Sequence, residues 1–243
     1  MRGDGGMASR IRPWHDMVEL CRGNPDELAL WVEPENGGKI GVCLLWIVLG
    51  AGVFGATIGM WRAPVQSAYV AVKFPLLIVL TTVANGLING MMAQLIGARM
   101  TFRQVSLAIL MSFTIACIIL GSLAPLTFFV IWNTPPFGAE GQEYSHQVIL
   151  LFTVLLLAFS GVVGNVRLYG LLKHFCKDRL VAMRVLFVWL AGNLFLGAQL
   201  SWNLRPFIGG PSGEVEFLRS NWNESTFYES VWEMWKSLIM NVF

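Results

Sequence analysis

The sequence predicts an all-α membrane protein, a bundle of five transmembrane helices with amphipathic segments at both ends. Hydrophobic residues make up 55% of the 243 residues and charged residues only 13%, whereas a typical soluble domain carries about 25% charged residues. A chain this apolar cannot stay solvated, which excludes a disordered protein. Four cysteines in this length do not indicate a disulfide scaffold. The formal net charge of +2 gives no reason to expect a nucleic acid partner.

Five apolar stretches are long enough to cross the hydrocarbon core of a bilayer, which takes about 20 residues of helix. The segment between the first two contains Arg62, Pro64 and Lys73, so we expect a short interfacial connector there rather than part of a span. The predicted spans are 40–60, 74–97, 105–131, 148–172 and 185–202. The chain therefore divides into an N-terminal tail over 1–39, a helix bundle over 40–202 and a C-terminal tail over 203–243.

The distribution of basic residues predicts the orientation of the bundle. Cytoplasmic loops of membrane proteins carry an excess of Lys and Arg. Twelve of the 17 basic residues fall on the side of the N-terminal tail and five on the other side. Trp61, Trp132 and Trp202 end three of the spans on that second side, where the headgroup level favours Trp. We therefore expect the N-terminus in the cytoplasm and the C-terminus outside.

Small residues at intervals of four predict that the spans pack closely. Lipid gives helices no hydrophobic reason to associate, so their backbones approach where small residues line the contact. Such residues recur in the first, second and fourth spans, at Gly55, Gly59, Gly86, Gly90 and Gly164. This recurrence indicates a compact bundle rather than separate anchors.

Three amide side chains in the second span are the best candidates for chemistry. Asn85 and Asn89 are one helical turn apart and share a face, and Gln94 lies on the Gly86 and Gly90 side. An amide in hydrocarbon must find a hydrogen-bond partner, so these groups either bond across a helix contact or line a path for a solute or an ion. We favour the helix contact, because no Asp, Glu or Lys lies deep in any predicted span.

Residues for catalysis or metal binding are not grouped in the sequence. His146 and His174 bracket the fourth span, which places them roughly 42 Å apart at 1.5 Å per helical residue. His15 lies in the N-terminal tail without a Cys or carboxylate at a ligand-like interval. We therefore expect no enzyme activity, no metal site and no evident cofactor, while a bound lipid or pigment stays open.

Both tails contain predicted helices. In the N-terminal tail, Asn24 precedes a Pro-Asp-Glu start and an apolar run over 28–32, and a second short helix is expected over 13–21. These segments are expected to lie on the membrane or on a partner.

The C-terminal tail has a capping pair, Thr226 and Glu229, and an apolar stripe that predicts an amphipathic helix over 225–242. The polar face is acidic, which suits folding back on the bundle or docking on another subunit better than binding anionic lipid. The expected partner or lipid contacts are Trp202, Arg205, Phe227, Trp232 and Trp235.

The segment Ser201-Trp-Asn-Leu-Arg-Pro-Phe-Ile-Gly-Gly-Pro211, with Phe-Leu-Arg at 217–219 and Phe-Tyr-Glu-Ser-Val-Trp at 227–232, resembles a group of uncharacterised bacterial multi-span membrane proteins. The resemblance covers about the last fifth of the chain. It implies a bacterial cytoplasmic membrane and brings no activity or site residues.

These patterns together favour a non-catalytic accessory, scaffold or assembly subunit of a larger membrane complex, surrounded by lipid and by other membrane protein subunits. The alternative is a small channel or carrier that uses the polar face of the second span.

Overall fold

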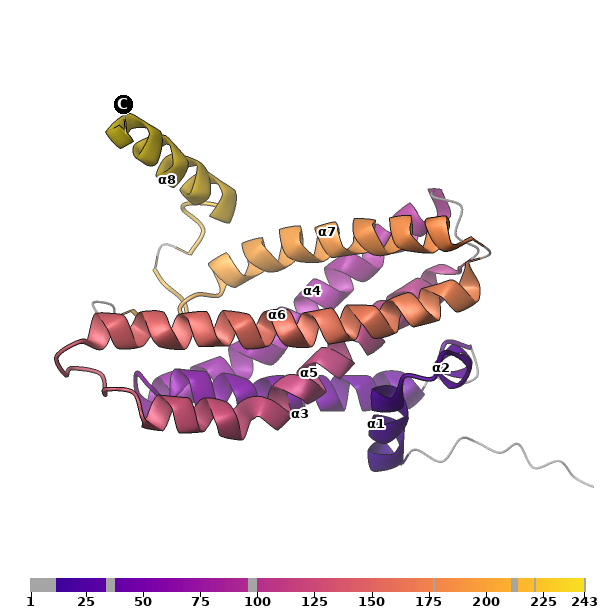
Figure 1. The fold of residues 1–243 in the computed structure, drawn as a ribbon, viewed down its shortest axis with the longest axis horizontal. Helices are drawn as coiled ribbons and strands as arrows, with labels where there is room; N and C mark the ends of the chain where they lie inside the picture. The colour runs from indigo at the N-terminus through magenta and orange to yellow at the C-terminus, as the bar shows by residue number, and fades with distance from the viewer. Residues whose placement is uncertain are drawn as a thin grey trace, which may run out of the picture.

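The computed structural model describes residues 12–33, 38–95, 100–176, 178–210, 214–220 and 222–242. These residues form eight helices, and five of the helices are long and apolar enough to cross a membrane. The predicted all-α fold is therefore confirmed (Figure 1). The five long apolar helices make the protein a multi-pass membrane protein in contact with lipid. The helices are α1 (Pro13–Arg22), α2 (Pro25–Trp31), α3 (Gly38–Gly59), α4 (Pro64–Leu95), α5 (Phe102–Trp132), α6 (Gln142–Phe175), α7 (Arg179–Asn203) and α8 (Phe227–Val242).

The prediction of a connector between the first two spans is wrong, because α4 begins at Pro64 and runs unbroken to Leu95. Pro64 stands in the first turn, where a helix does not need the N–H that proline lacks. The helix continues past Lys73 and through Pro75. A lysine therefore lies inside a membrane helix, contrary to the expectation that none would.

Helix α5 is the central helix of the bundle. Of the 18 consecutive residues that are most apolar in each helix, 61% are buried in α5, 22% in α6 and 17% in α7. Helices α3, α4 and α6 pack on α5, while α7 lies mainly against α4. The bundle therefore leaves large parts of α6 and α7 uncovered.

Glycines mark the close helix crossings. A Cβ added at Gly55 would lie 2.6 Å from the carbonyl oxygen of Val70, and one at Gly59 would lie 2.8 Å from that of Gln66, so both glycines face α4. A further close approach joins α3 to α5, because a Cβ at Gly121 would lie 2.8 Å from the Cα of Gly50.

Three more glycines at contacts with α5 are among those that the sequence singles out. Gly86 and Gly90 on α4 face the side chains of Ser106 and Phe102. On α6, a Cβ at Gly164 would lie 2.7 Å from the carbonyl oxygen of Ser112.

The two N-terminal helices cap one end of the bundle, which we call the α1/α2 end (Figure 1). Both helices were predicted, and the side chain of Asn24 accepts a hydrogen bond from the Asp26 N–H at the start of α2. Lys39 at the start of α3 pairs with Asp16 at 2.7 Å. Leu20, Leu28, Trp31 and Val32 are buried in the main apolar core. The helices thus pack on their own bundle.

Helix α8 stands away from the bundle at the opposite end (Figure 1). Its predicted capping box is present: the Thr226 N–H donates to the Glu229 carboxylate at 2.8 Å, and the Glu229 N–H donates to the Thr226 hydroxyl at 3.1 Å. Among the described residues of α8, those bonded to α7 are in the first turn, where the Tyr228 hydroxyl donates to the Phe195 carbonyl at 2.6 Å. The helix therefore does not fold back along the bundle, which was one of its two expected positions.

Candidate functional site

Buried polar side chains gather where α4 packs against α7 and against the segment that follows α7. Gln66, Lys73 and Asn85 are 0% exposed and Asn89 is 1% exposed. A Cβ at Gly192 of α7 would lie 3.0 Å from the Asn85 carbonyl oxygen and 3.6 Å from that of Asn89. We call this contact the α4–α7 seam. On one side it consists of the four α4 residues, and on the other side of α7 together with residues 206 and 207.

The two asparagines bond to each other across one helical turn. The Asn89 Nδ2 donates to the Asn85 Oδ1 at 3.4 Å, while the Asn85 Nδ2 and the Asn89 Oδ1 have no partner among the described residues. Nearby on α7, the same holds for the Trp189 Nε1 and the Asn193 Oδ1. A buried unpaired polar group costs about 1–3 kcal/mol. Donors and acceptors that still need partners are thus concentrated in this part of the seam.

The other end of the seam is built around Lys73. Its ammonium donates to the Pro206 carbonyl at 3.0 Å and lies 5.0 Å from the centre of the Phe217 ring. Gln66 donates to the same carbonyl at 3.0 Å and to that of Phe207 at 2.9 Å. The charge of Lys73 is therefore held by a backbone carbonyl and an aromatic face, and residues 206 and 207 are fastened to α4.

Gln66 and Lys73 were not predicted as site residues, because both lie in the segment that was expected to be a connector. Their spacing of seven residues places them on one face of a helix. That spacing is the signal in the sequence that links them, once the helix is known to begin at Pro64.

The predicted contact residues of the C-terminal tail separate into two groups. Trp202, Arg205 and Phe227 form the joint between α7 and α8: the Arg205 guanidinium lies 3.3 Å from the centre of the Trp202 ring, and that ring lies 6.0 Å from the ring of Phe227. Burial and the nearby charge of Arg219 lower the pKa of Arg205 below its ordinary value. Trp232 and Trp235 lie beyond the joint and are each 57% exposed.

The remaining candidates do not share one site. The side chain of Gln94 lies outside the described residues. Trp61 is only 6% exposed and donates to the Pro135 carbonyl, so its ring is packed against protein. His146 lies beside Trp61, with ring centres 5.8 Å apart, and His174 lies 3.4 Å from Asp26 at the α1/α2 end.

One group of metal-ligand types does come together, in α1. Ligand atoms of His15, Asp16 and Glu19 lie within 4.8 Å of one another. The expectation that His15 has no carboxylate at a ligand-like interval is therefore wrong, because Glu19 is one helical turn away. Asp16 is already paired with Lys39, however, which gives its carboxylate a counter-ion.

Comparison of the chain with protein-family models, with curated proteins and with solved structures found no match.

Proposed function

We propose that this protein is a non-catalytic accessory, scaffold or assembly subunit of a larger membrane complex. The observation that carries the proposal is α8, an amphipathic helix that stands away from the bundle with Trp232 and Trp235 more than half exposed (Figure 1). Large aromatic side chains in such a position are typical of the residues that dominate protein–protein contacts.

The charge of α8 favours a protein partner over an anionic membrane surface. Helices that bind anionic lipid carry Lys and Arg on their polar face. In and just before α8 there are three acidic residues, Glu224, Glu229 and Glu233, and one basic residue, Lys236. Lys236 already pairs with Glu233 at 2.7 Å. Anionic lipid would repel this face, whereas a partner with a basic patch would complement it.

A groove between α6 and α7 supports the same proposal. It has a cavity volume of about 670 Å³ and is lined mainly by aliphatic side chains. Asn165 also lines it, and its Oδ1 is covered without a hydrogen-bond partner among the described residues, while its Nδ2 donates to the Gly161 carbonyl at 2.7 Å. The apolar face of a helix from a neighbouring subunit would fill this groove.

The proposed location is a bacterial cytoplasmic membrane, with the N-terminus in the cytoplasm and α8 outside. The excess of basic residues on the side of the N-terminal tail supports this orientation.

The test is purification in a gentle detergent from the native membrane, followed by mass measurement. We expect a defined complex that contains other membrane proteins. The double variant Trp232→Ser/Trp235→Ser should lose those proteins. The control Trp132→Ser should keep them, because Trp132 is 76% exposed but ends α5. A monomer or homo-oligomer free of other proteins would contradict the proposal.

A second function, a small-solute or ion channel or carrier, is favoured by one observation. Asn85 and Asn89, which face Gly192 of α7, have side-chain groups without a partner among the described residues, and so do Trp189 and Asn193 on the same stretch of α7. Replacing both Asn85 and Asn89 by Leu should then abolish flux through the protein reconstituted in vesicles. Unchanged flux in this variant would exclude the path.

A further inference from the structure

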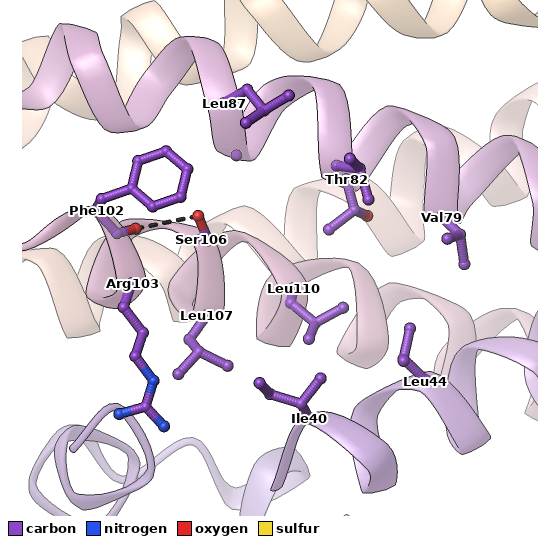
Figure 2. A pocket seen from close by; sticks show the side chains of 12 residues that line it. Ile40, Leu44, Val79, Thr82, Leu87, Phe102, Arg103, Ser106, Leu107 and Leu110 are labelled. Atoms are coloured by element: carbon purple, nitrogen blue, oxygen red, sulfur yellow. Dashed lines mark hydrogen bonds between the residues drawn. The ribbon is translucent and has the colours of Figure 1, made fainter. Parts of the chain in front are cut away.

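An apolar groove opens between α3, α4 and α5 near the α1/α2 end of the bundle (Figure 2). Its cavity volume is about 440 Å³, within the range of small-molecule sites. Ile40 on α3, Val83 on α4 and Phe102 on α5 line it and are 37%, 57% and 43% exposed, so the groove is open sideways toward the bilayer. Its deeper wall includes Leu107 and Leu110, which are nearly buried.

Of the polar side chains that line the groove, Arg103 is without a partner among the described residues. The Thr82 hydroxyl donates to the Ile78 carbonyl at 2.7 Å, and the Ser106 hydroxyl donates to the Phe102 carbonyl at 3.0 Å. Both hydroxyls are therefore used within their own helices. Arg103 has no hydrogen bond or ion pair with any described residue, and Figure 2 shows its guanidinium at one end of the groove, beyond Leu107.

The groove runs from the membrane interface into the hydrocarbon. Arg103 is the second residue of α5 and Ile40 the third of α3, so this end of the groove lies where two membrane helices begin. Leu110 lies seven residues after Arg103, about 10 Å deeper at 1.5 Å per residue. The charge of Arg103 thus lies at headgroup level, and the apolar part of the groove extends from it into the hydrocarbon.

We propose that this groove binds a glycerophospholipid of net negative charge, with its phosphate on Arg103 and one acyl chain along Leu107 and Leu110. A guanidinium binds phosphate through two parallel N–H donors. Phosphatidylcholine also has a phosphate, but its choline cation is repelled by Arg103, whereas phosphatidylglycerol carries no such cation. The first turn of α5 adds the positive end of its helix dipole beside Arg103. This lipid site is independent of the proposed accessory function.

The groove is less suited to a transmembrane helix of a partner. Close helix packing in lipid needs small residues on the face that is offered. Gly86 is the one glycine that lines the groove, and a Cβ built on it would lie 3.1 Å from the Ser106 hydroxyl, so it is turned toward α5. The open face presents Leu and Val side chains instead, which suits a flexible acyl chain.

The test is native mass spectrometry of the full chain in a detergent that contains equal amounts of phosphatidylglycerol and phosphatidylcholine. We expect one retained phosphatidylglycerol per chain. Arg103→Gln should lower the phosphatidylglycerol preference about tenfold, the value of one charge-assisted contact, and Arg103→Lys should restore part of it. Val83→Trp places a bulky ring in the groove and should reduce the retention of both lipids.

Two controls decide whether the site is specific. Arg184→Gln removes an exposed charge near the same end, on α7, and should leave lipid retention unchanged. The unfolding temperature of the unaltered protein should rise with added phosphatidylglycerol and not with phosphatidylcholine. The proposal would be overturned if Arg103→Gln retained as much phosphatidylglycerol as the unaltered protein, or if Arg184→Gln lost as much as Arg103→Gln. A photo-cross-linker at residue 83 in the native membrane should capture lipid, and capture of a protein instead would also overturn the proposal.

Discussion

The ammonium of Lys73 donates a hydrogen bond of 3.0 Å to the carbonyl oxygen of Pro206, which joins a membrane helix to the segment that follows the last span. Gln66 donates to the same oxygen. This carbonyl therefore fastens the C-terminal part of the chain to α4, and it does so through two donors that are both fully buried.

Lys73→Met should release residues 206 and 207 from α4. A hydrogen bond that involves a charged group is worth about 1.5–3 kcal/mol, and the loss is partly offset because an ammonium no longer has to be buried. We expect a free energy of unfolding lower by about 1 kcal/mol and faster protease cleavage in 204–220. Lys236→Met is the control, because Lys236 pairs with Glu233 in the exposed part of α8. Equal cleavage in the two variants would disprove the fastening role.

Gly50→Ala should separate α3 from α5. The added Cβ would meet the carbonyl of Cys117, a backbone atom that cannot move aside without shifting the helix. Overpacking of this kind costs about 1–3 kcal/mol, so the unfolding temperature in detergent should fall. Gly161→Ala is the matched control, because nothing lies within 4 Å of its Cβ position. If Gly161→Ala lowers the unfolding temperature as much as Gly50→Ala, the crossing is not the cause.

Thr226→Ala should loosen the start of α8. The Thr226 hydroxyl accepts the Glu229 N–H, and loss of such a cap costs about 0.5–2 kcal/mol. Hydrogen exchange of the backbone amides over 227–242 should become faster, while exchange in α5 stays unchanged. Ser237→Ala serves as the control, since its hydroxyl donates to the Met234 carbonyl inside the same helix. Unchanged exchange in Thr226→Ala would show that α8 is held by other contacts.

Cys21 provides a test of orientation. In a variant that keeps Cys21 and has the other three cysteines replaced by Ala, a membrane-impermeant maleimide should react in inverted vesicles and not in right-side-out ones. Asn223→Cys in a chain without the native cysteines should show the reverse pattern. Labelling of both positions from the same side would contradict the proposed orientation.

The pH dependence of this labelling follows from the environment of Cys21. Desolvation raises the pKa of its thiol above the ordinary value, and the charge of Arg167 offsets part of the rise. The thiolate is the reactive form. At neutral pH the reaction should therefore be slower than that of a free thiol, and its rate should keep increasing at pH values where a free thiol has already reached its maximum.

The helices could be predicted from the sequence because the bilayer requires long apolar segments, and hydropathy reports those directly. The start of α4 could not. In the sequence around it, Lys73 is a charged residue, which predicts the end of a span. The groups that stabilise it in the bundle belong to Pro206 and Phe217, more than 130 residues later in the chain.

The close approach at Gly50 shows a similar limit. The neighbouring Ala51 and Gly52 are small as well, and the rotation of α3 against α5 decides which residue meets Gly121. The asparagine pair was identified from its spacing, but the residue of α7 that faces it, Gly192, depends on how two helices more than 100 residues apart in the sequence are packed.

The contact between Lys73 and Pro206 also has a consequence for synthesis of the protein. The two residues are 133 positions apart, and a ribosome adds about 5–20 residues per second. Lys73 therefore enters the membrane on the order of ten seconds before its carbonyl partner exists. During that interval another group must solvate the ammonium, such as the insertion machinery, water or a lipid headgroup.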